Sequence, residues 1–193
     1  HEGYDGDPTT NAATTPIYQT TSFTFNDTQH GADLFNLAVP GNIYSRIMNP
    51  TNAVLEARLA ALEGGVGALA VGSGMAAIRY AIEAITAMGD NIVSTSQLYG
   101  GTYNLFAHTF PRQGIEVRMA AADDLQLAKS LIDANTKALY CESIGNPAGN
   151  VVDIEAWAAI AHDAGIPLIV DNTVGTPFLC KVFDHGADIV VHS

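Results

Sequence analysis

Residues 138–171 read ALYCESIGNPAGNVVDIEAWAAIAHDAGIPLIVD, and this stretch decides the fold. It contains a short apolar run at 138–141, a helix-like segment at 153–164 and a second apolar run at 167–171. Continuous apolar runs of this length, separated by a helix, are typical of parallel strands that are buried on both faces. We therefore interpret 138–171 as a strand–helix–strand unit.

The same alternation of apolar runs and helix-like segments continues on both sides of this unit. We expect further strands over 68–71, 91–94, 115–119 and 187–192. We expect further helices over 49–63, 75–88, 102–113, 123–134 and 178–185. The predicted fold class is therefore α/β, a mostly parallel sheet that helices cover on both faces.

Residues 1–50 differ from the rest of the chain because they are rich in Thr, Asn, Gly and Pro. Turn-forming residues dominate this segment and no sustained helical period is present, although 17–23 favours an extended chain. A long segment with little regular structure usually has a function or wraps a partner. We expect an extended N-terminal arm over 1–50 that contacts a partner subunit, followed by a large domain over 51–193.

The composition excludes several classes of protein. Hydrophobic residues make up 48% of the chain and charged residues only 15%, whereas roughly 25% charged residues is usual. This balance excludes a disordered tail or a coiled coil, and it favours a protein that hides surface in an oligomer. The net charge of −12 argues against binding to nucleic acid or to an anionic membrane. No apolar run approaches the roughly 20 residues that cross a bilayer.

Cysteine and histidine usage argues against two further kinds of site. Cys141 and Cys180 lie far apart without CxxC spacing, which argues against a disulfide scaffold and against a zinc site. The six histidines show no metal-ligand spacing, so we expect no metal site. Sparse cysteines fit a reducing compartment, and we expect a cytoplasmic protein.

Ligands of parallel sheets bind at the carboxyl ends of the strands, so the residues that follow each predicted strand are the candidates. The turn at 72–75, Gly-Ser-Gly-Met, precedes a predicted helix, whose exposed backbone N–H groups would suit a phosphate. This turn lacks the Gly-Lys-Ser/Thr of a Walker A loop, and Ala77 stands at the third glycine position of a dinucleotide fingerprint. A tight turn that only needs small residues is the alternative interpretation.

Three further side chains could contact a phosphorylated cofactor. Asp171 ends a buried strand, where a carboxylate needs a cation such as a protonated ring nitrogen. Tyr99, in a glycine-bordered loop, could stack on a planar ring and transfer a proton. Arg46, beside Tyr44, could bind a phosphate through two parallel hydrogen bonds. Taken singly, each also fits an ordinary role: a helix cap or turn, a half-buried loop tyrosine, and a surface ion pair.

Six motifs occur together in one order along the chain: YSRIMNPT (44–51), SGMAA (73–77), YGGT (99–102), ESIGNP (142–147), DNT (171–173) and GADIVVHS (186–193). With these motifs the chain resembles, over essentially its whole length, the Cys/Met-metabolism pyridoxal 5'-phosphate (PLP) enzymes. Any one motif is weak, whereas all six in the order and spacing of the family are strong evidence. The resemblance implies the large domain of the PLP-dependent transferase fold type I.

The resemblance implies a role for residues in each of these motifs. The cofactor-binding residues would be Tyr44, Arg46, Ser73, Gly74, Met75, Tyr99, Asn146, Asp171, Thr173 and Ser193. The backbone N–H groups of Gly74 and Met75 and the hydroxyl of Ser193 would bind the PLP phosphate. Tyr44 and Arg46 would reach the phosphate of the neighbouring subunit, which implies a homo-oligomer with shared active sites, as in a dimer of dimers.

Around the cofactor ring, the resemblance implies two catalytic residues and two further contacts. Asp171 would pair with the protonated ring nitrogen and keep the ring an electron sink. Tyr99 would stack on the ring and relay a proton to or from the leaving group. Thr173 would flank the ring, and Asn146 would contact the phenolic oxygen of the cofactor or the substrate.

One residue that this chemistry requires is not among these motifs, because PLP enzymes bind their cofactor covalently through a lysine. Lys129, Lys137 and Lys181 are the only lysines of the sequence, and none follows a predicted strand. In the family the reactive lysine follows the serine of the last motif by three residues, so we expect it three residues beyond Ser193. The resemblance thus implies that 51–193 is an incomplete PLP-binding domain and that the C-terminal domain lies outside this chain.

Two motifs narrow the resemblance within the family. Residues 99–106, YGGTYNLF, and 142–147 look most like those of O-acetylhomoserine sulfhydrylases, whereas methionine γ-lyases usually carry Cys where Gly101 stands. The resemblance implies that sulfide replaces the γ-acetate of O-acetyl-L-homoserine, which gives homocysteine and acetate in methionine biosynthesis. The alternatives are γ-elimination, as in methionine or cystathionine γ-lyase, the reaction of cystathionine γ-synthase, and a non-catalytic chain that binds a phosphorylated ligand.

Overall fold

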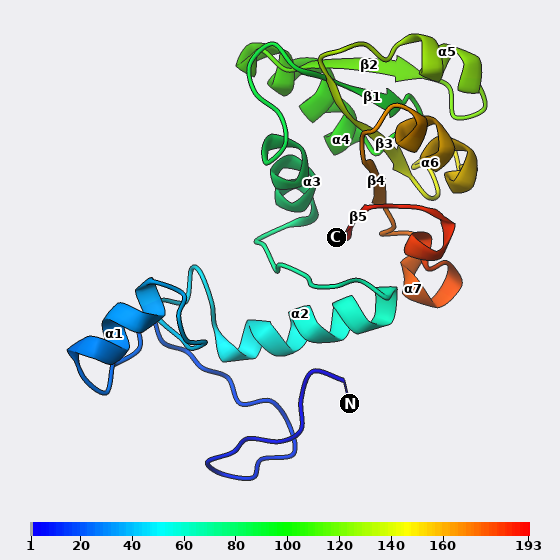
Figure 1. Ribbon diagram of the computed structural model, residues 1–193. Helices are drawn as coiled ribbons and strands as arrows, with labels where there is room; N and C mark the ends of the chain where they lie inside the picture. Colours follow the sequence, from blue (N-terminus) through cyan, green and yellow to red (C-terminus); the bar gives the residue numbers. More distant parts are fainter. Residues whose placement is uncertain (1) are drawn as a thin grey trace. The chain divides into compact units, whose positions relative to one another are not determined.

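The computed structural model describes residues 2–193, and the chain divides into two compact units, 1–70 and 71–193. The first unit, blue to cyan in Figure 1, contains two helices, α1 (Thr28–Phe35) and α2 (Pro50–Glu63). It therefore includes α2 in addition to the segment 1–50 that the sequence analysis expected as an arm.

Helix α1 corrects the expectation that residues 1–50 contain no helix. The Asp27 carboxylate caps α1 by accepting a hydrogen bond from the His30 N–H, and Leu34 is buried. A helix of two turns has too few apolar repeats for its periodicity to stand out, so the cap is the clearer signal. The segment 17–23, expected to be extended, forms no strand within residues 2–193. It pairs with 43–45 through an isolated bridge between Ser22 and Tyr44 and through backbone hydrogen bonds.

Helix α2 begins and ends where the sequence predicts. The Asn49 side chain accepts a hydrogen bond from the Thr51 N–H, and Pro50 occupies the first helical position. Gly64 ends the helix with a φ of +82°, a left-handed conformation that glycine adopts without strain.

The second unit contains a five-stranded sheet in which all strands are parallel, in the order β2-β1-β3-β4-β5. The strands are β1 (Asn91–Thr95), β2 (Glu116–Ala120), β3 (Thr136–Glu142), β4 (Leu168–Asp171) and β5 (Ile189–Val191). Glu142 of β3 lies beside Asp171 of β4, and Asp171 lies beside Val191 of β5. The carboxyl ends of these three strands therefore meet at one edge of the sheet, as the sequence predicts.

The strand expected over 68–71 is absent from the part of the chain that the structure describes. This run pairs with no strand within residues 2–193, and Leu69 is 72% exposed. Apolar residues form a strand only where a neighbour satisfies their backbone groups, and alanine has a low β-propensity. The prediction from the apolar run alone was therefore wrong.

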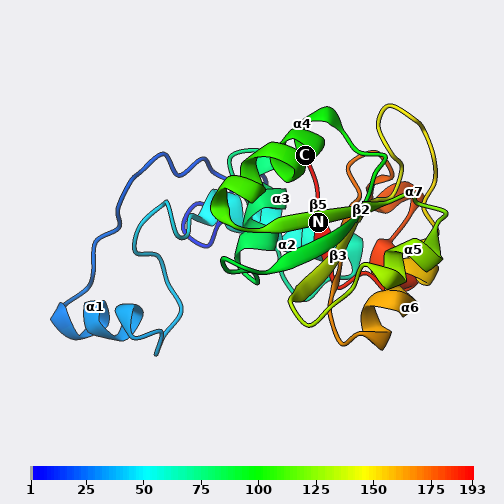
Figure 2. The ribbon, with the colours of Figure 1, turned by 90° about the horizontal axis from the view of Figure 1, so that it is seen from above.

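The strands carry two hydrophobic cores, one on each face of the sheet. On one face Val93 and Leu139 pack with Trp157, and on the other Ile92 and Tyr140 pack with Phe106. Helices cover both faces of the sheet (Figure 2). The first face is covered by α5 (Leu125–Ser130) and α6 (Ile154–Asp163). The second face is covered by α3 (Gly74–Glu83), α4 (Gly100–Asn104), the π-helical η1 (Leu105–Thr109) and the 3-10 helix η2 (Phe110–Gln113). Burial on both faces explains the continuous apolar runs 138–141 in β3 and 168–170 in β4.

Several helices differ in extent from the prediction. The helix expected over 102–113 is α4, η1 and η2 in succession, and the one over 178–185 is α7 (Thr176–Leu179) and the 3-10 helix η3 (Val182–His185). Helices α3 and α5 end early because Asp90 and Thr136 accept hydrogen bonds from the backbone N–H groups of Ala87 and Asp133, which form turns instead.

Within residues 2–193 no helix combines the length and the apolar character that crossing a membrane requires.

Candidate active site

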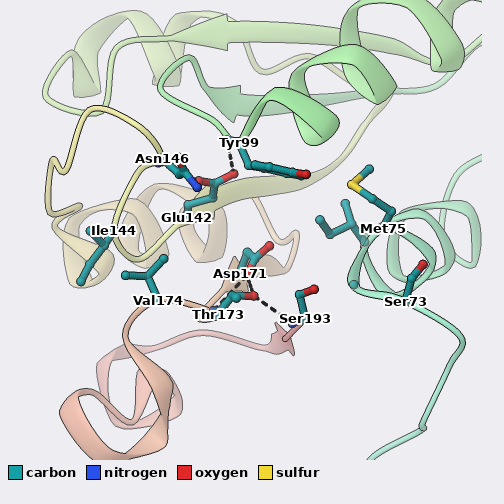
Figure 3. A pocket seen from close by; sticks show the side chains of 12 residues that line it. Ser73, Met75, Tyr99, Glu142, Ile144, Asn146, Asp171, Thr173, Val174 and Ser193 are labelled. Carbon is teal, nitrogen blue, oxygen red and sulfur yellow. Dashed lines mark hydrogen bonds between the residues drawn. The ribbon is translucent and has the colours of Figure 1, made fainter.

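A cavity of about 250 Å³ lies at the carboxyl edge of the sheet (Figure 3). It is lined by all the predicted site residues that belong to the second unit: Ser73, Gly74, Met75, Tyr99, Asn146, Asp171, Thr173 and Ser193. The remaining lining residues are Ile78, Glu142, Ile144 and Val174. The start of α3 and the ends of β1, β3, β4 and β5 thus contribute to one cavity, as expected for a parallel sheet.

The start of α3 provides one end of the cavity with backbone donors. Ser73 caps the helix by accepting a hydrogen bond from the Ala76 N–H at 3.1 Å, whereas the N–H groups of Gly74 and Met75 have no carbonyl partner inside the helix. A Cβ at Gly74 would lie 2.4 Å from the Ser193 Cβ, so only glycine lets Ser193 approach the helix this closely. Two free N–H groups and a nearby hydroxyl at a helix N-terminus suit an anion.

Asp171 provides a carboxylate without a cationic partner. Its Oδ1 atom accepts hydrogen bonds from the Thr173 N–H at 3.0 Å and from the Thr173 Oγ1 at 2.5 Å, and Oδ2 lies 3.5 Å from the Tyr140 hydroxyl. None of the ion pairs found within residues 2–193 includes Asp171. Burial, followed by the charge of Asp171, raises the pKa of Tyr140 well above its ordinary value, so this hydroxyl remains a donor. A cationic ligand group would complete this arrangement.

Thr173 connects Asp171 with the end of the last strand. Its Oγ1 atom donates to Asp171 and accepts a hydrogen bond from the Ser193 N–H at 2.9 Å. The carboxylate and the anion-binding end of the cavity are therefore held by one short chain of hydrogen bonds.

Tyr99 provides an accessible aromatic ring at the start of α4. Its side chain is 51% exposed, and in Figure 3 the ring and the Asp171 carboxylate face the same space. A Cβ at Gly101 would lie 2.6 Å from Cε1 of this ring, so any larger residue at 101 would displace the ring. The ring is free to stack on a planar ligand between itself and Asp171.

Glu142 belongs to the cavity although the sequence analysis gave it no role. Its carboxylate accepts hydrogen bonds from the Tyr99 N–H at 2.7 Å and from the Asn146 N–H at 3.2 Å. Burial, followed by the charge of Asp171, raises the pKa of this carboxyl above its ordinary value, while the two N–H groups act in the opposite direction. An acidic residue at the end of an otherwise apolar strand is the signal that could have identified it.

Tyr44 and Arg46, also predicted to bind the cofactor, belong to the first unit. The Arg46 guanidinium carbon lies 5.6 Å from the centroid of the Tyr44 ring, and both side chains are exposed. Their predicted contact with the phosphate of a neighbouring subunit stays a prediction.

The three lysines lie away from the cavity lining. Lys129 and Lys137 pair with Asp163 and Asp90 at 3.7 and 3.5 Å, and Lys181 precedes η3. Across residues 2–193 there is also no cluster of His, Cys, Asp or Glu side chains that could hold a metal ion.

The sequence profile of one family, described as Cys/Met metabolism PLP-dependent enzyme, matches residues 1–193. The chain belongs to this family. The match covers the whole chain, which confirms the resemblance drawn from the six motifs.

Two relatives and one solved structure match this chain over its whole length. Homocysteine synthase from Schizosaccharomyces pombe is 54% identical, and O-acetyl-L-homoserine sulfhydrylase from Leptospira meyeri is 49% identical, each over 100% of this chain. A crystal structure assigned to an O-acetylhomoserine (thiol)-lyase from Campylobacter jejuni, with N'-pyridoxyl-lysine-5'-monophosphate, covers 100% of this chain with a TM-score of 0.97 and 46% identity. The predicted α/β fold is thereby confirmed as that of PLP enzymes of fold type I.

The chain spans less than half the length of these relatives. It covers 45% of the homocysteine synthase, 44% of the sulfhydrylase and 47% of the crystallised chain.

Proposed function

We propose that the natural full-length protein uses PLP to replace the γ-acetate of O-acetyl-L-homoserine by sulfide, which yields homocysteine and acetate. The observation that carries this proposal is the cavity, in which a helix N-terminus, an unpaired carboxylate and an exposed tyrosine ring face one another. The choice of substrate is supported by the relatives named homocysteine synthase and O-acetyl-L-homoserine sulfhydrylase, at 54% and 49% identity.

The residues of the cavity fit PLP in charge and in shape. The free N–H groups of Gly74 and Met75 and the Ser193 hydroxyl would bind the phosphate, in a cradle that a Cβ at Gly74 would fill. Asp171, which lacks a cation, would accept the protonated ring nitrogen. When bound, PLP supplies an electron sink for charge that develops at the substrate carbons.

The residues of the chain itself would position this chemistry and move protons. The Asp171 carboxylate, oriented by Thr173, would hold a proton at the ring nitrogen of the cofactor. The Tyr99 ring would stack on the ring of the cofactor, and its exposed hydroxyl would relay a proton at the leaving group. Asn146 would contact the phenolic oxygen or the substrate.

Two contributions would come from outside the described cavity. Tyr44 and Arg46 would bind the phosphate of a neighbouring subunit, which makes the protein a homo-oligomer. The reactive lysine would follow Ser193, because none of the three lysines of this chain lines the cavity. Within residues 2–193 neither Cys141 nor Cys180 forms a disulfide, and on this ground we propose a cytoplasmic enzyme.

The test is an assay of the natural full-length protein with PLP, O-acetyl-L-homoserine and sulfide. We expect visible absorbance from bound PLP, and homocysteine and acetate in equal amounts. Absence of both the absorbance and the homocysteine would refute the proposal and would favour a chain that binds another phosphorylated ligand. Release of ammonia and an α-keto acid in the absence of sulfide, with no homocysteine in its presence, would instead indicate γ-elimination.

A further inference from the structure

Tyr99 and Asn146 lie on loops that leave different strands, and one carboxylate holds both loops. Tyr99 follows β1, and Asn146 follows β3. The Glu142 Oε1 atom accepts from the Tyr99 N–H at 2.7 Å, and its Oε2 atom accepts from the Asn146 N–H at 3.2 Å (Figure 3). The two oxygens of a single side chain therefore connect the two loops.

Glu142 is a costly residue for this place if stability alone is considered. It is 4% exposed, and its neighbour across the sheet is a second carboxylate, Asp171. None of the ion pairs within the described range 2–193 includes Glu142. A buried carboxylate without a cation beside another carboxylate destabilises the fold unless its hydrogen bonds offset the cost. An apolar side chain would avoid this cost but would provide no acceptor for the two N–H groups.

The loop after β1 is anchored before Tyr99, where the Ser96 N–H donates to the Ala120 carbonyl and Leu98 is buried, but Tyr99 itself has few other restraints. The Tyr99 side chain is 51% exposed, no side chain caps the start of α4, and Gly100 and Gly101 follow directly. The bond to Glu142 joins residues 43 positions apart and is the long-range hydrogen bond that anchors the Tyr99 backbone. Bonds from a carboxylate to backbone N–H groups are charge-assisted and therefore strong.

We propose that Glu142 is a positioning residue, which fixes the Tyr99 ring and Asn146 at the separation that a planar cofactor and its substrate require. This inference rests on the proposed function, because it assumes that Tyr99 and Asn146 contact cofactor and substrate. Glu142 acts through these two residues and contacts no reacting atom.

The variant Glu142→Gln tests this role with almost no change in shape. One of its oxygens becomes an NH₂ group, which cannot accept, so either the Tyr99 or the Asn146 N–H loses its partner. In the natural full-length protein we expect PLP to bind about tenfold more weakly, with an altered circular dichroism of the bound cofactor. The control Glu155→Gln changes an exposed glutamate outside the cavity and should leave both measurements unchanged.

A double-mutant cycle separates positioning from general stability. In a Tyr99→Ala background, Glu142→Gln should weaken PLP binding much less than in the wild type, because the ring that it positions is gone. Fully additive effects, or wild-type PLP affinity and dichroism in Glu142→Gln, would overturn the proposal.

Hydrogen exchange keeps this inference separate from the proposed function. In the PLP-free protein, we expect faster exchange of the backbone amides around Tyr99 and Asn146 in Glu142→Gln than in the wild type. If the wild type binds no PLP, the proposed function fails, and unchanged exchange in the variant would then also reject Glu142 as the anchor of the two loops.

Discussion

Three hydrogen-bond donors lie beside the Asp171 carboxylate, and none of the ion pairs within residues 2–193 includes it. Thr173 supplies two hydrogen bonds to one oxygen, and the Tyr140 hydroxyl lies 3.5 Å from the other. These neutral donors orient the carboxylate without neutralising its charge. A charge that is oriented and left unpaired at a cavity is what a cationic ligand group requires.

Replacing Asp171 by Asn tests whether its charge is needed. The amide keeps the shape of the side chain but cannot pair with a protonated ring nitrogen, so we expect turnover of O-acetylhomoserine to fall by about a hundredfold or more. The measurement is kcat in saturating PLP, with Asp163→Asn, an exposed aspartate that pairs with Lys129, as the control. Near-normal turnover in Asp171→Asn would refute the assigned role.

Gly101→Ala tests the space beside the Tyr99 ring. The added Cβ would lie 2.6 Å from Cε1 of Tyr99 and 3.0 Å from the Met75 Sδ, so the ring must move. We expect PLP affinity to fall about fivefold, the value of one lost aromatic contact, as measured by titration of the apoprotein. Gly100→Ala is the matched control, because a Cβ there meets nothing within 4 Å. If Gly101→Ala bound PLP as tightly as Gly100→Ala, the position of the Tyr99 ring would not be critical for PLP binding.

Sequence reasoning predicted that Asp171 and Tyr99 lie at one site but assigned no role to Glu142, for a physical reason. Asp171 ends β4 and Tyr99 follows β1, and parallel topology brings strand ends together, so their order in the chain is enough to predict that they meet. Glu142 ends β3 in the same way, so its place at this edge was also predictable, whereas its contacts were not. The partners of Glu142 are backbone N–H groups, one of them 43 residues away. Backbone groups carry no sequence signature, so only the folded chain reveals this contact.

At the scale of elements, the cavity depends on the junction between the start of α3 and the end of β5. A Cβ at Gly74 would lie 2.4 Å from the Ser193 Cβ and 2.8 Å from its Cα, so a backbone as well as a side chain stands in its way. Any residue larger than glycine at position 74 would therefore force α3 or the end of β5 to shift.

Gly74→Ala should disturb this junction and weaken the phosphate site. We expect PLP to bind about tenfold more weakly, because adding one methyl group to a well-packed site usually costs about this much. Gly72→Ala adds the same methyl group two residues earlier, where nothing lies within 4 Å, and should bind PLP as the wild type does. Dissociation constants from equilibrium dialysis provide the comparison; a Gly72→Ala variant as weak as Gly74→Ala would point to a general effect on the turn.

The elements that the sequence predicts well are those that pack on both sides. The strands β3 and β4 contain the continuous apolar runs 138–141 and 168–170 because both faces of the sheet are buried there, and such a run is then a reliable sign. The run at 68–71 shows the limit of this sign, since four apolar residues without a pairing neighbour form no strand. The helix expected over 102–113 is divided into α4, η1 and η2, and Pro111, near the start of η2, is the signal in the sequence that one regular α-helix does not extend over this range.

At the scale of the whole molecule, 20 acidic residues against 8 basic ones place a large share of the surface charge on carboxylates. Two of them carry strong hydrogen bonds in the folded state, one in each unit. Asp7 accepts from the Tyr18 hydroxyl and from the Thr10 N–H, which lowers its pKa to about 2. Asp133 accepts from Asn91 and Arg118, which lowers its pKa well below its usual range.

These lowered pKa values predict a loss of stability in acid. A carboxyl whose pKa is lower in the folded than in the unfolded chain stabilises the fold above its unfolded pKa, 3.8 here. The contribution is therefore constant near neutrality and is lost as the pH falls from about 4 towards 2. Glu142 has the opposite effect on the pH dependence of stability: its pKa is raised in the folded chain, so protonating it favours the folded state.

Asp133→Asn should remove one part of this acid sensitivity, because the amide does not titrate. Asp133 joins the starts of β1 and β3 to Arg118 of β2, so its charge supports the amino edge of the sheet at neutral pH. We expect the variant to melt at a lower Tm than the wild type at pH 7, and the two curves of Tm against pH to converge as the pH approaches 2. Circular dichroism of the natural full-length protein between pH 2 and 8 measures this, with the exposed Asp123→Asn as the control that should follow the wild type. A difference in Tm that stays constant over the whole range would mean that the effect of Asp133 does not arise from its charge.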